Sequence, residues 1–214
     1  MEGELAAAIV GVREAFAGYP RRKVLEGCPH CRGSVLVDDH DLFSLTISLG
    51  NTVGNRGDVK SLLPVLFERM VRSDELDPSI VLGMLLREEW RTWPGVEQDA
   101  IDRYLEAVWR CLLADYASRL GSFLDAATFL DAASSAGEGA DRFLAIWDAT
   151  LGSSADRHLA DAVNGCNFAS RRPSDLGDWL RREMVRDRLR RAFERDHDAV
   201  WADDLARAYD LVRP

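Results

Sequence analysis

Apolar residues recur every three or four positions over most of the chain, the spacing of residues that share one face of an α-helix. The first segment with this spacing covers residues 4–17, and Gly18 and Pro20 favour its end. The same spacing predicts helices over 59–72, 78–90, 95–117, 122–133, 139–151, 154–168, 175–185, 186–195 and 198–212. Asp58 is the expected N-cap of the helix that follows it, and Pro78 stands in the first turn of the next.

The segment before Gly50 is ambiguous. Residues 34–37 are either a short strand or an extended segment. In the segment that follows, the β-branched residues within 45–48 favour a strand. The leucines recur at three- and four-residue spacing, which instead predicts a helix that carries Leu42 and Leu49. We expect this helix, with Asp38 or Asp39 as its N-cap.

These segments predict an all-α fold of eight to ten helices. Two architectures remain open, an irregular multi-helix bundle and a short HEAT-like α-solenoid, because helix pairs of about 35–45 residues are present without a sharp repeat. No composition break is long enough to be a linker. We therefore expect a single helical domain over 1–214, in which an N-terminal helix and a CxxC connector (1–57) precede a helical body (58–214).

Charge and composition limit the partners. Asp and Glu number 36 against 27 Lys and Arg, a net charge of −9, which argues against a dedicated nucleic-acid binder. No apolar run approaches the roughly 18–20 residues of a membrane helix, so we expect no membrane partner. Glu2 and Glu4 stand where a signal peptide would carry positive charge, so we expect a cytoplasmic protein. In that reducing compartment the four cysteines are thiols or metal ligands.

Residues 28–31, with the sequence CPHC, are the one motif that carries chemistry. A thioredoxin-like redox pair needs a low thiolate pKa at a helix N-terminus, after a core strand. Residues 21–27 make a poor buried strand, which disfavours it. A zinc knuckle fits better, because Cys28 and Cys31 followed by Gly33 make a turn that presents two thiolates to one tetrahedral ion. Without a second CxxC, a tight turn with two reduced thiols explains the segment at least as well.

A structural zinc ion needs four ligands, so Cys28 and Cys31 supply half of a site. His40 is the candidate for the third ligand. Further candidates are His30, Asp38, Asp39, Cys111 and Cys166. Zinc is the only cofactor that the sequence suggests.

Other motifs are weaker. The glycine-rich loop that leads into residues 58–61 resembles a phosphate-binding loop, but Val59 stands where glycine would precede the Lys-Ser pair, and Asp58 would repel phosphate. We expect a flexible connector instead. Neither H-E-x-x-H nor G-x-S-x-G occurs. The six tryptophans fall mostly on apolar helix faces and are expected in the core or lining a groove.

Residues 171–195 contain nine arginines against five acidic residues, a local excess of four positive charges. Most such faces are solvated and contain ion pairs between neighbouring turns. The face over Arg181–Arg191 is nevertheless the best candidate for nucleic-acid binding.

Three parts of the chain together resemble a family of uncharacterised bacterial proteins. These proteins share a Tyr-Pro and two nearby cysteines near the start, a later Gly-Asp that leads into a helix with Leu-Pro, and C-terminal helices of this type. The matching parts are residues 16–31, residues 57–67, and the pair of segments 142–163 and 179–211. The resemblance covers most of the chain and implies an all-helical fold, a helix over 41–50 and a working pair of Cys28 and Cys31. It implies no activity.

The leading hypothesis is a cytosolic, non-catalytic module that binds another protein, since no catalytic constellation is visible and amphipathic helices rich in Trp and Leu commonly form binding surfaces. The alternative is a metal- or thiol-dependent enzyme centred on Cys28 and Cys31. A weaker alternative is nucleic-acid binding through Arg181–Arg191.

Overall fold

The computed structural model describes residues 2–28, 33–38, 41–116, 119–166 and 175–212. Within them lie eleven α-helices, one 3₁₀-helix and one two-stranded antiparallel sheet, so the all-α class is confirmed and the helix count exceeds the expected eight to ten. The elements are α1 (Glu2–Ala15), β1 (Val24–Leu25), β2 (Val35–Leu36), α2 (Leu42–Ser48), α3 (Arg56–Arg72), α4 (Pro78–Arg87), η1 (Trp90–Thr92), α5 (Gly95–Ala114), α6 (Ala126–Ser135), α7 (Asp141–Ala149), α8 (Ser153–Gly165), α9 (Asp175–Leu180), α10 (Glu183–Asp196) and α11 (Ala202–Leu211).

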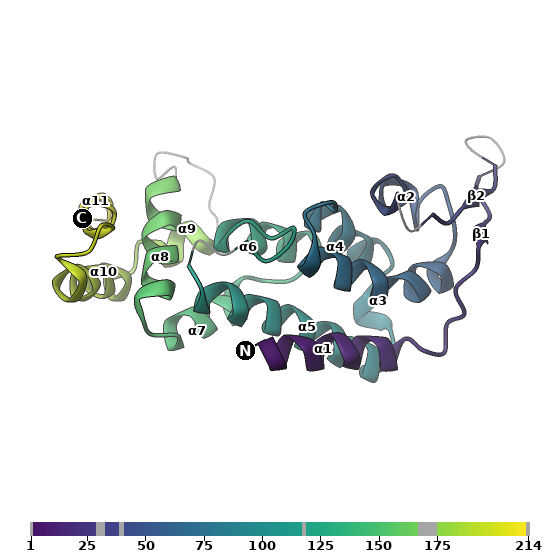
Figure 1. Ribbon diagram of the computed structural model, residues 1–214, viewed down its shortest axis with the longest axis horizontal. Coiled ribbons are helices and arrows are strands. Elements are labelled where there is room, and N and C mark those ends of the chain that lie inside the picture. The colour runs from purple at the N-terminus through teal and green to yellow at the C-terminus, as the bar shows by residue number, and fades with distance from the viewer. Residues whose placement is uncertain (1, 29–32, 39–40, 117–118, 167–174, 213–214) are drawn as a thin grey trace.

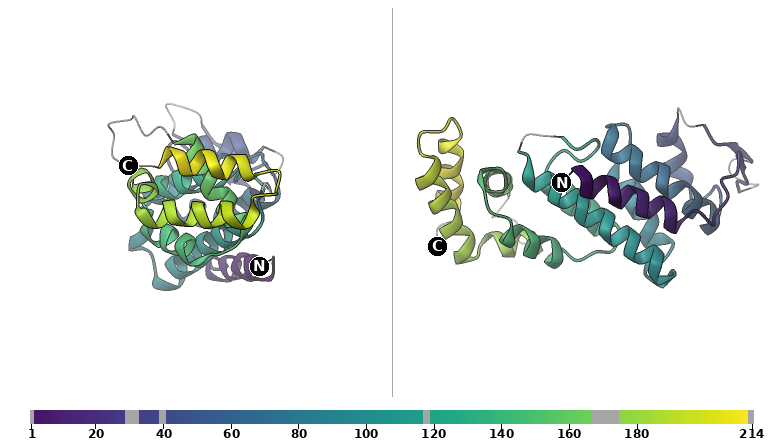
Figure 2. Two further views of the ribbon diagram at one scale, coloured as in Figure 1. Left: turned by 90° about the vertical axis from the view of Figure 1, so that its left-hand side faces the viewer. Right: turned by 60° about the horizontal axis from the view of Figure 1, so that its bottom comes forward.

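The helices are arranged along one long axis (Figure 1). The sheet and α2 lie at one end of the molecule, and α10 and α11 lie at the other. α1 packs alongside α5, α4 alongside α6, and α11 alongside α8. Figure 2 shows α8 between the α10–α11 pair and the rest of the molecule. Within the described ranges, no helix is both long enough and apolar enough to cross a bilayer.

Two helices begin at residues other than the expected ones. Asn55, not Asp58, is the N-cap of α3, and Asp58 completes a capping box by accepting the backbone N–H of Asn55 at 2.9 Å. Asp41 is the N-cap of α2, where its side chain accepts the N–H of Ser44. The expected cap at Asp39 lies outside the described residues. The helix expected after Pro78 is confirmed, with Asp77 as its cap.

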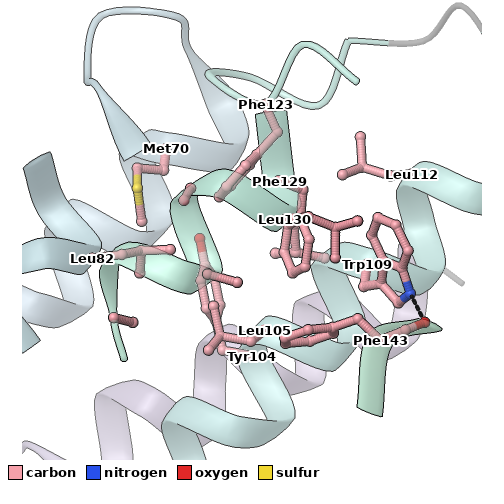
Figure 3. Close-up of a cluster of buried hydrophobic side chains, with 14 of the residues drawn as sticks. Met70, Leu82, Tyr104, Leu105, Trp109, Leu112, Phe123, Phe129, Leu130 and Phe143 are labelled. Atoms are coloured by element: carbon pink, nitrogen blue, oxygen red, sulfur yellow. Dashed lines mark hydrogen bonds between the residues drawn. The ribbon is translucent and has the colours of Figure 1, made fainter. Parts of the chain in front are cut away.

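A continuous apolar core runs from Leu5 in α1 to Ala208 in α11. Figure 3 shows its centre, where the Trp109 ring of α5 stacks on Phe129 of α6 with centroids 5.0 Å apart. The indole N–H of Trp109 donates to the carbonyl of Phe143 at 2.8 Å. Because this buried donor is satisfied, the ring contributes its full apolar area without an orphaned polar group. Five of the six tryptophans are buried, as expected.

A small sheet forms within the segment that the sequence predicted to be a CxxC connector. β1 and β2 pair in antiparallel register, with Val24 opposite Leu36 and Leu25 opposite Val35. Leu25 is buried against the core, and Leu36 is exposed. The short strand considered for residues 34–37 is therefore present, and the helix expected after it is α2.

Candidate functional site

The chain around the CxxC motif is closed by backbone contacts. The N–H of Cys28 donates to the carbonyl of Thr52 at 2.7 Å, and the N–H of Gly33 donates to the carbonyl of Cys28 at 3.4 Å. A Cβ on Gly27 would lie 1.8 Å from the carbonyl oxygen of Gly33, so only glycine fits there. Cys31 lies outside the described residues, and its side chain is not placed relative to Cys28.

In the described part of the chain, the candidate zinc ligands do not form a metal-binding group with Cys28. His40 lies outside the described residues. Cys166 is the C-cap of α8, and α8 lies toward the opposite end of the molecule from β1 (Figures 1 and 2). Among the residues that the structure describes, no group of three or more His, Cys, Asp or Glu side chains is placed to hold a metal ion.

A buried ionic cluster joins the Tyr-Pro segment to the helical body. Lys60 of α3 lies 2.6 Å from the Glu97 carboxylate of α5, and both side chains are less than a tenth exposed. The Tyr19 hydroxyl donates to the other Glu97 oxygen at 2.6 Å and accepts from Lys60 at 3.1 Å. The Lys60 ammonium also lies 4.4 Å from the ring centroid of Trp93. All three polar side chains of the cluster are therefore bonded to one another within the chain.

A second ion pair joins the same N-terminal segment to the start of α3. Arg22 forms a bidentate contact with the carboxylate of Asp58. Burial would raise the pKa of Asp58, but the hydrogen bonds from Arg22 and the N–H of Asn55 hold it below its ordinary value. This pair occupies the start of α3, where a phosphate would have to bind. The loop before α3 is also held to the N-terminal segment, because the N–H of Gly54 donates to the carbonyl of Glu26.

The basic stretch near the C-terminus contains a similar cluster that the sequence did not reveal. Arg188 is mostly buried between helices, and its guanidinium contacts Asp156 at 2.6 Å and the carbonyls of Trp147 and Thr150 at 2.7 and 2.6 Å. Arg195 contacts the second Asp156 oxygen at 2.9 Å. Arg188 thus holds α10 against α7 and α8, and is not part of a free basic face.

One cavity, of about 260 Å³, combines histidine, cysteine and acidic residues. His158 lines it but is only 3% exposed, and its Nε2 lies 3.4 Å from the carbonyl of Asp115, the C-cap of α5. Burial lowers the pKa of His158 despite the nearby carbonyls and the carboxylates of Asp161 and Asp125. Burial also raises the pKa of the Cys166 thiol, which disfavours the reactive thiolate.

The Tyr116 hydroxyl, beside His158, is also hydrogen-bonded within the chain. It donates to Asp161 at 2.5 Å, and its ring contacts the imidazole edge-on with centroids 5.1 Å apart. Burial and the Asp161 carboxylate together raise the pKa of Tyr116 to about 12. A neutral imidazole that faces helix carbonyls and a phenol that holds its proton give this cavity a structural role at the end of α5.

The largest of the described cavities, of about 460 Å³, is a groove between α1 and α5. Its floor is made of small residues, and charged residues stand along its edges. The floor is formed by Ala7, Ala8, Gly11, Ala15 and Ala100, with Val96 at one end; the charged residues are Glu4, Glu14, Arg103 and Glu106. None of the residues lining it is a histidine, cysteine or aspartate.

The sequence did not single out this groove, although it contains a signal for it. Ala7, Gly11 and Ala15 recur at four-residue spacing and so share one face of α1. In comparisons of the chain with protein-family models, curated proteins and solved structures, none matches. The function of the chain must therefore be inferred from its own geometry.

Proposed function

We propose that the protein is a non-catalytic helical module that binds another protein in the groove between α1 and α5. The observation that carries this proposal is that the largest described cavity is lined mainly by small apolar residues, while the buried ionisable groups outside it are bonded within the chain. Catalytic sites instead gather such groups in a cavity with hydrogen-bonding capacity to spare.

The exposed side of α1 supports the proposal. Ala6, Ala7 and Val10 are exposed on a helix whose opposite side packs against α5 through buried Leu5 and Ile9. Contiguous exposed apolar residues on a protein surface mark contact sites for other proteins. The outer face of α1 has no neighbour within the described part of the chain, and a partner would cover it (Figure 1).

Site-directed photocrosslinking in cells tests the proposal. Benzoylphenylalanine at Val96, which lines the groove, is expected to give a discrete adduct, whereas the same group at Val200 is not. Val200 is even more exposed, and it lies in the connection between α10 and α11, which form one end of the molecule (Figure 1). Gly11→Leu, which fills the groove, should abolish the Val96 adduct, and Gly11→Ala should retain it. Equal adducts at both positions, or an adduct insensitive to Gly11→Leu, would contradict the proposal.

The finer architecture is part of the same proposal. We infer that the helices form one domain, an irregular multi-helix bundle, because helices that are not consecutive along the chain pack together, α1 with α5, α4 with α6 and α8 with α11, and share one continuous core. Two of the segments that carry the resemblance to the bacterial family contact each other, since Tyr19 bonds Lys60 and Arg22 bonds Asp58. A cytoplasmic location fits the reduced cysteines that we expect.

A zinc knuckle at the hairpin is the second candidate function. The observation that favours it is that Gly33 adopts a φ of +61° and its N–H donates to the carbonyl of Cys28. Glycine with positive φ next to a CxxC pair suits two thiolates that point at one ion. Elemental analysis of protein purified without chelator tests it. One equivalent of zinc, lost in Cys28→Ser, would support the knuckle, and metal-free, fully folded protein would rule it out.

A further inference from the structure

We infer that the partner in the α1–α5 groove is an amphipathic helix with small or apolar residues on its docking face and a lysine or arginine at each end. This inference rests on the proposed function, and deepens it by naming the chemistry of the partner.

The floor of the groove suits a helix. Ala7, Gly11 and Ala15 leave the backbone of α1 almost bare along one line, so a second helix can lie along it at close range. A Cβ on Gly11 would meet no heavy atom within 4 Å, which shows open space above the middle of the floor. An extended peptide would find no unpaired strand edge here, because α1 and α5 satisfy their own backbone hydrogen bonds.

The charges at the ends of the groove specify the partner. At one end Arg110 lies 3.5 Å from Glu4 and 3.3 Å from Glu106, so one cation is shared by two carboxylates. At the other end Glu14 makes no ion pair with any residue in the described part of the chain. Arg103 is matched by Asp99 on its own helix. One negative charge is therefore uncompensated at each end.

The spacing of these charges fits a helix laid along α1. Glu4 and Glu14 are ten residues apart, which is about 15 Å at the helical rise of 1.5 Å per residue. Residues about eleven apart complete three turns and return to the same face of a partner helix, about 16 Å apart. Two basic residues at that spacing would reach both acidic ends while apolar residues between them cover the floor.

The same charges disfavour a second copy of this chain as the occupant. An antiparallel α1–α1 pair centred on Gly11 would place Glu4 of each copy about four residues, or about 6 Å along the axis, from Glu14 of the other, and a parallel pair would place Glu4 near Glu4. Like charges at this range oppose association. A concentration-dependent dimer in sedimentation velocity that Gly11→Leu dissolves would overturn the inference in favour of self-association.

Synthetic peptides test the inference directly. The probe is a fluorescein-labelled 16-residue helical peptide with alanine and leucine on one face and lysines eleven positions apart at its ends. The control has glutamates at those two positions and is otherwise identical. By fluorescence anisotropy the lysine peptide should bind, and its binding should weaken as NaCl is raised. The glutamate peptide should bind at least tenfold more weakly.

Variants of the protein assign the binding to the groove. Glu4→Gln with Glu14→Gln should weaken the lysine peptide about three- to tenfold, the range for two exposed ion pairs. The double variant Asp203→Gln with Asp210→Gln, on α11, should leave binding of the lysine peptide unchanged. Gly11→Leu should abolish this binding. Circular dichroism checks the fold of each variant.

The outcomes separate the two levels of the proposal. If both peptides bind equally and Gly11→Leu abolishes both, the groove binds helices but the basic partner is wrong. If the lysine peptide fails to bind while the Val96 crosslink is formed and lost in Gly11→Leu, the partner chemistry is again wrong and the docking site stands. If the peptide fails and the crosslink is absent, the proposed function fails as well.

Discussion

The buried pair of Lys60 and Glu97 gives the sharpest test of how the N-terminal segment is held. Both side chains are less than a tenth exposed, so a charge left alone there loses its solvation without compensation. Lys60→Met keeps the aliphatic stem and removes the ammonium. We expect it to lower the free energy of unfolding by about 3–5 kcal/mol, the range for breaking one side of a buried ion pair.

The double-mutant cycle makes the test specific. Glu97→Gln should also destabilise, by somewhat less, because the amide oxygen can still accept from the Tyr19 hydroxyl. In the double variant neither charge remains, so its cost should be smaller than the sum of the two single costs by about 2–3 kcal/mol. Urea unfolding followed by tryptophan fluorescence measures all four proteins, with unchanged m-values as the sign of two-state behaviour.

Lys23 supplies a matched control, since it is the only other lysine and is exposed beside β1. Lys23→Met should change the stability by no more than about 0.5 kcal/mol. Additive costs in the cycle, or a Lys60→Met variant as stable as Lys23→Met, would refute the view that this cluster anchors the segment.

Four further outcomes are expected. Stability should fall as the pH drops below about 6.5, because the unfolded state then binds a proton that buried His158 resists, and His158→Gln should weaken this loss in urea titrations at pH 7.5 and 5. Absorbance titration should show a tyrosine with a pKa of about 12 that disappears in Tyr116→Phe. Gly121→Ala should destabilise by more than about 1 kcal/mol in urea, since φ is +57° and the new Cβ would lie 2.2 Å from the carbonyl of Met70. Gly11→Ala should instead increase the free energy of unfolding by up to about 1 kcal/mol, because it adds a better helix former in open space, and thermal unfolding should show a higher midpoint.

Local patterns determined the helices well. The three- and four-residue spacing placed α1, α3 and α5 to within a few residues of their observed bounds, because this periodicity is a property of one continuous segment. Asp77 and Pro78 likewise mark the start of α4 through backbone chemistry that needs no distant partner. The burial of most tryptophans follows from their positions on apolar faces.

Tertiary structure decided where the ionic residues act. Asp58 and Asn55 are both good N-caps, and the distant Arg22, 36 residues away in sequence, pairs with Asp58 within the capping box. The excess of arginines near the C-terminus looked like a solvated face, yet Arg188 is mostly buried because Asp156 lies 32 residues before it on a packed neighbour. Charge counts along a chain do not record such partners.

The groove shows the same division. In the sequence, the alanines and the glycine of α1 only weaken the amphipathic pattern of a surface helix. They line a groove in the structure because α5 packs beside α1. A helix face is set by residues within a few turns, so the sequence alone specifies it. A cavity, a buried ion pair or a capped helix end needs two segments to meet, and their meeting depends on the packing of the whole core.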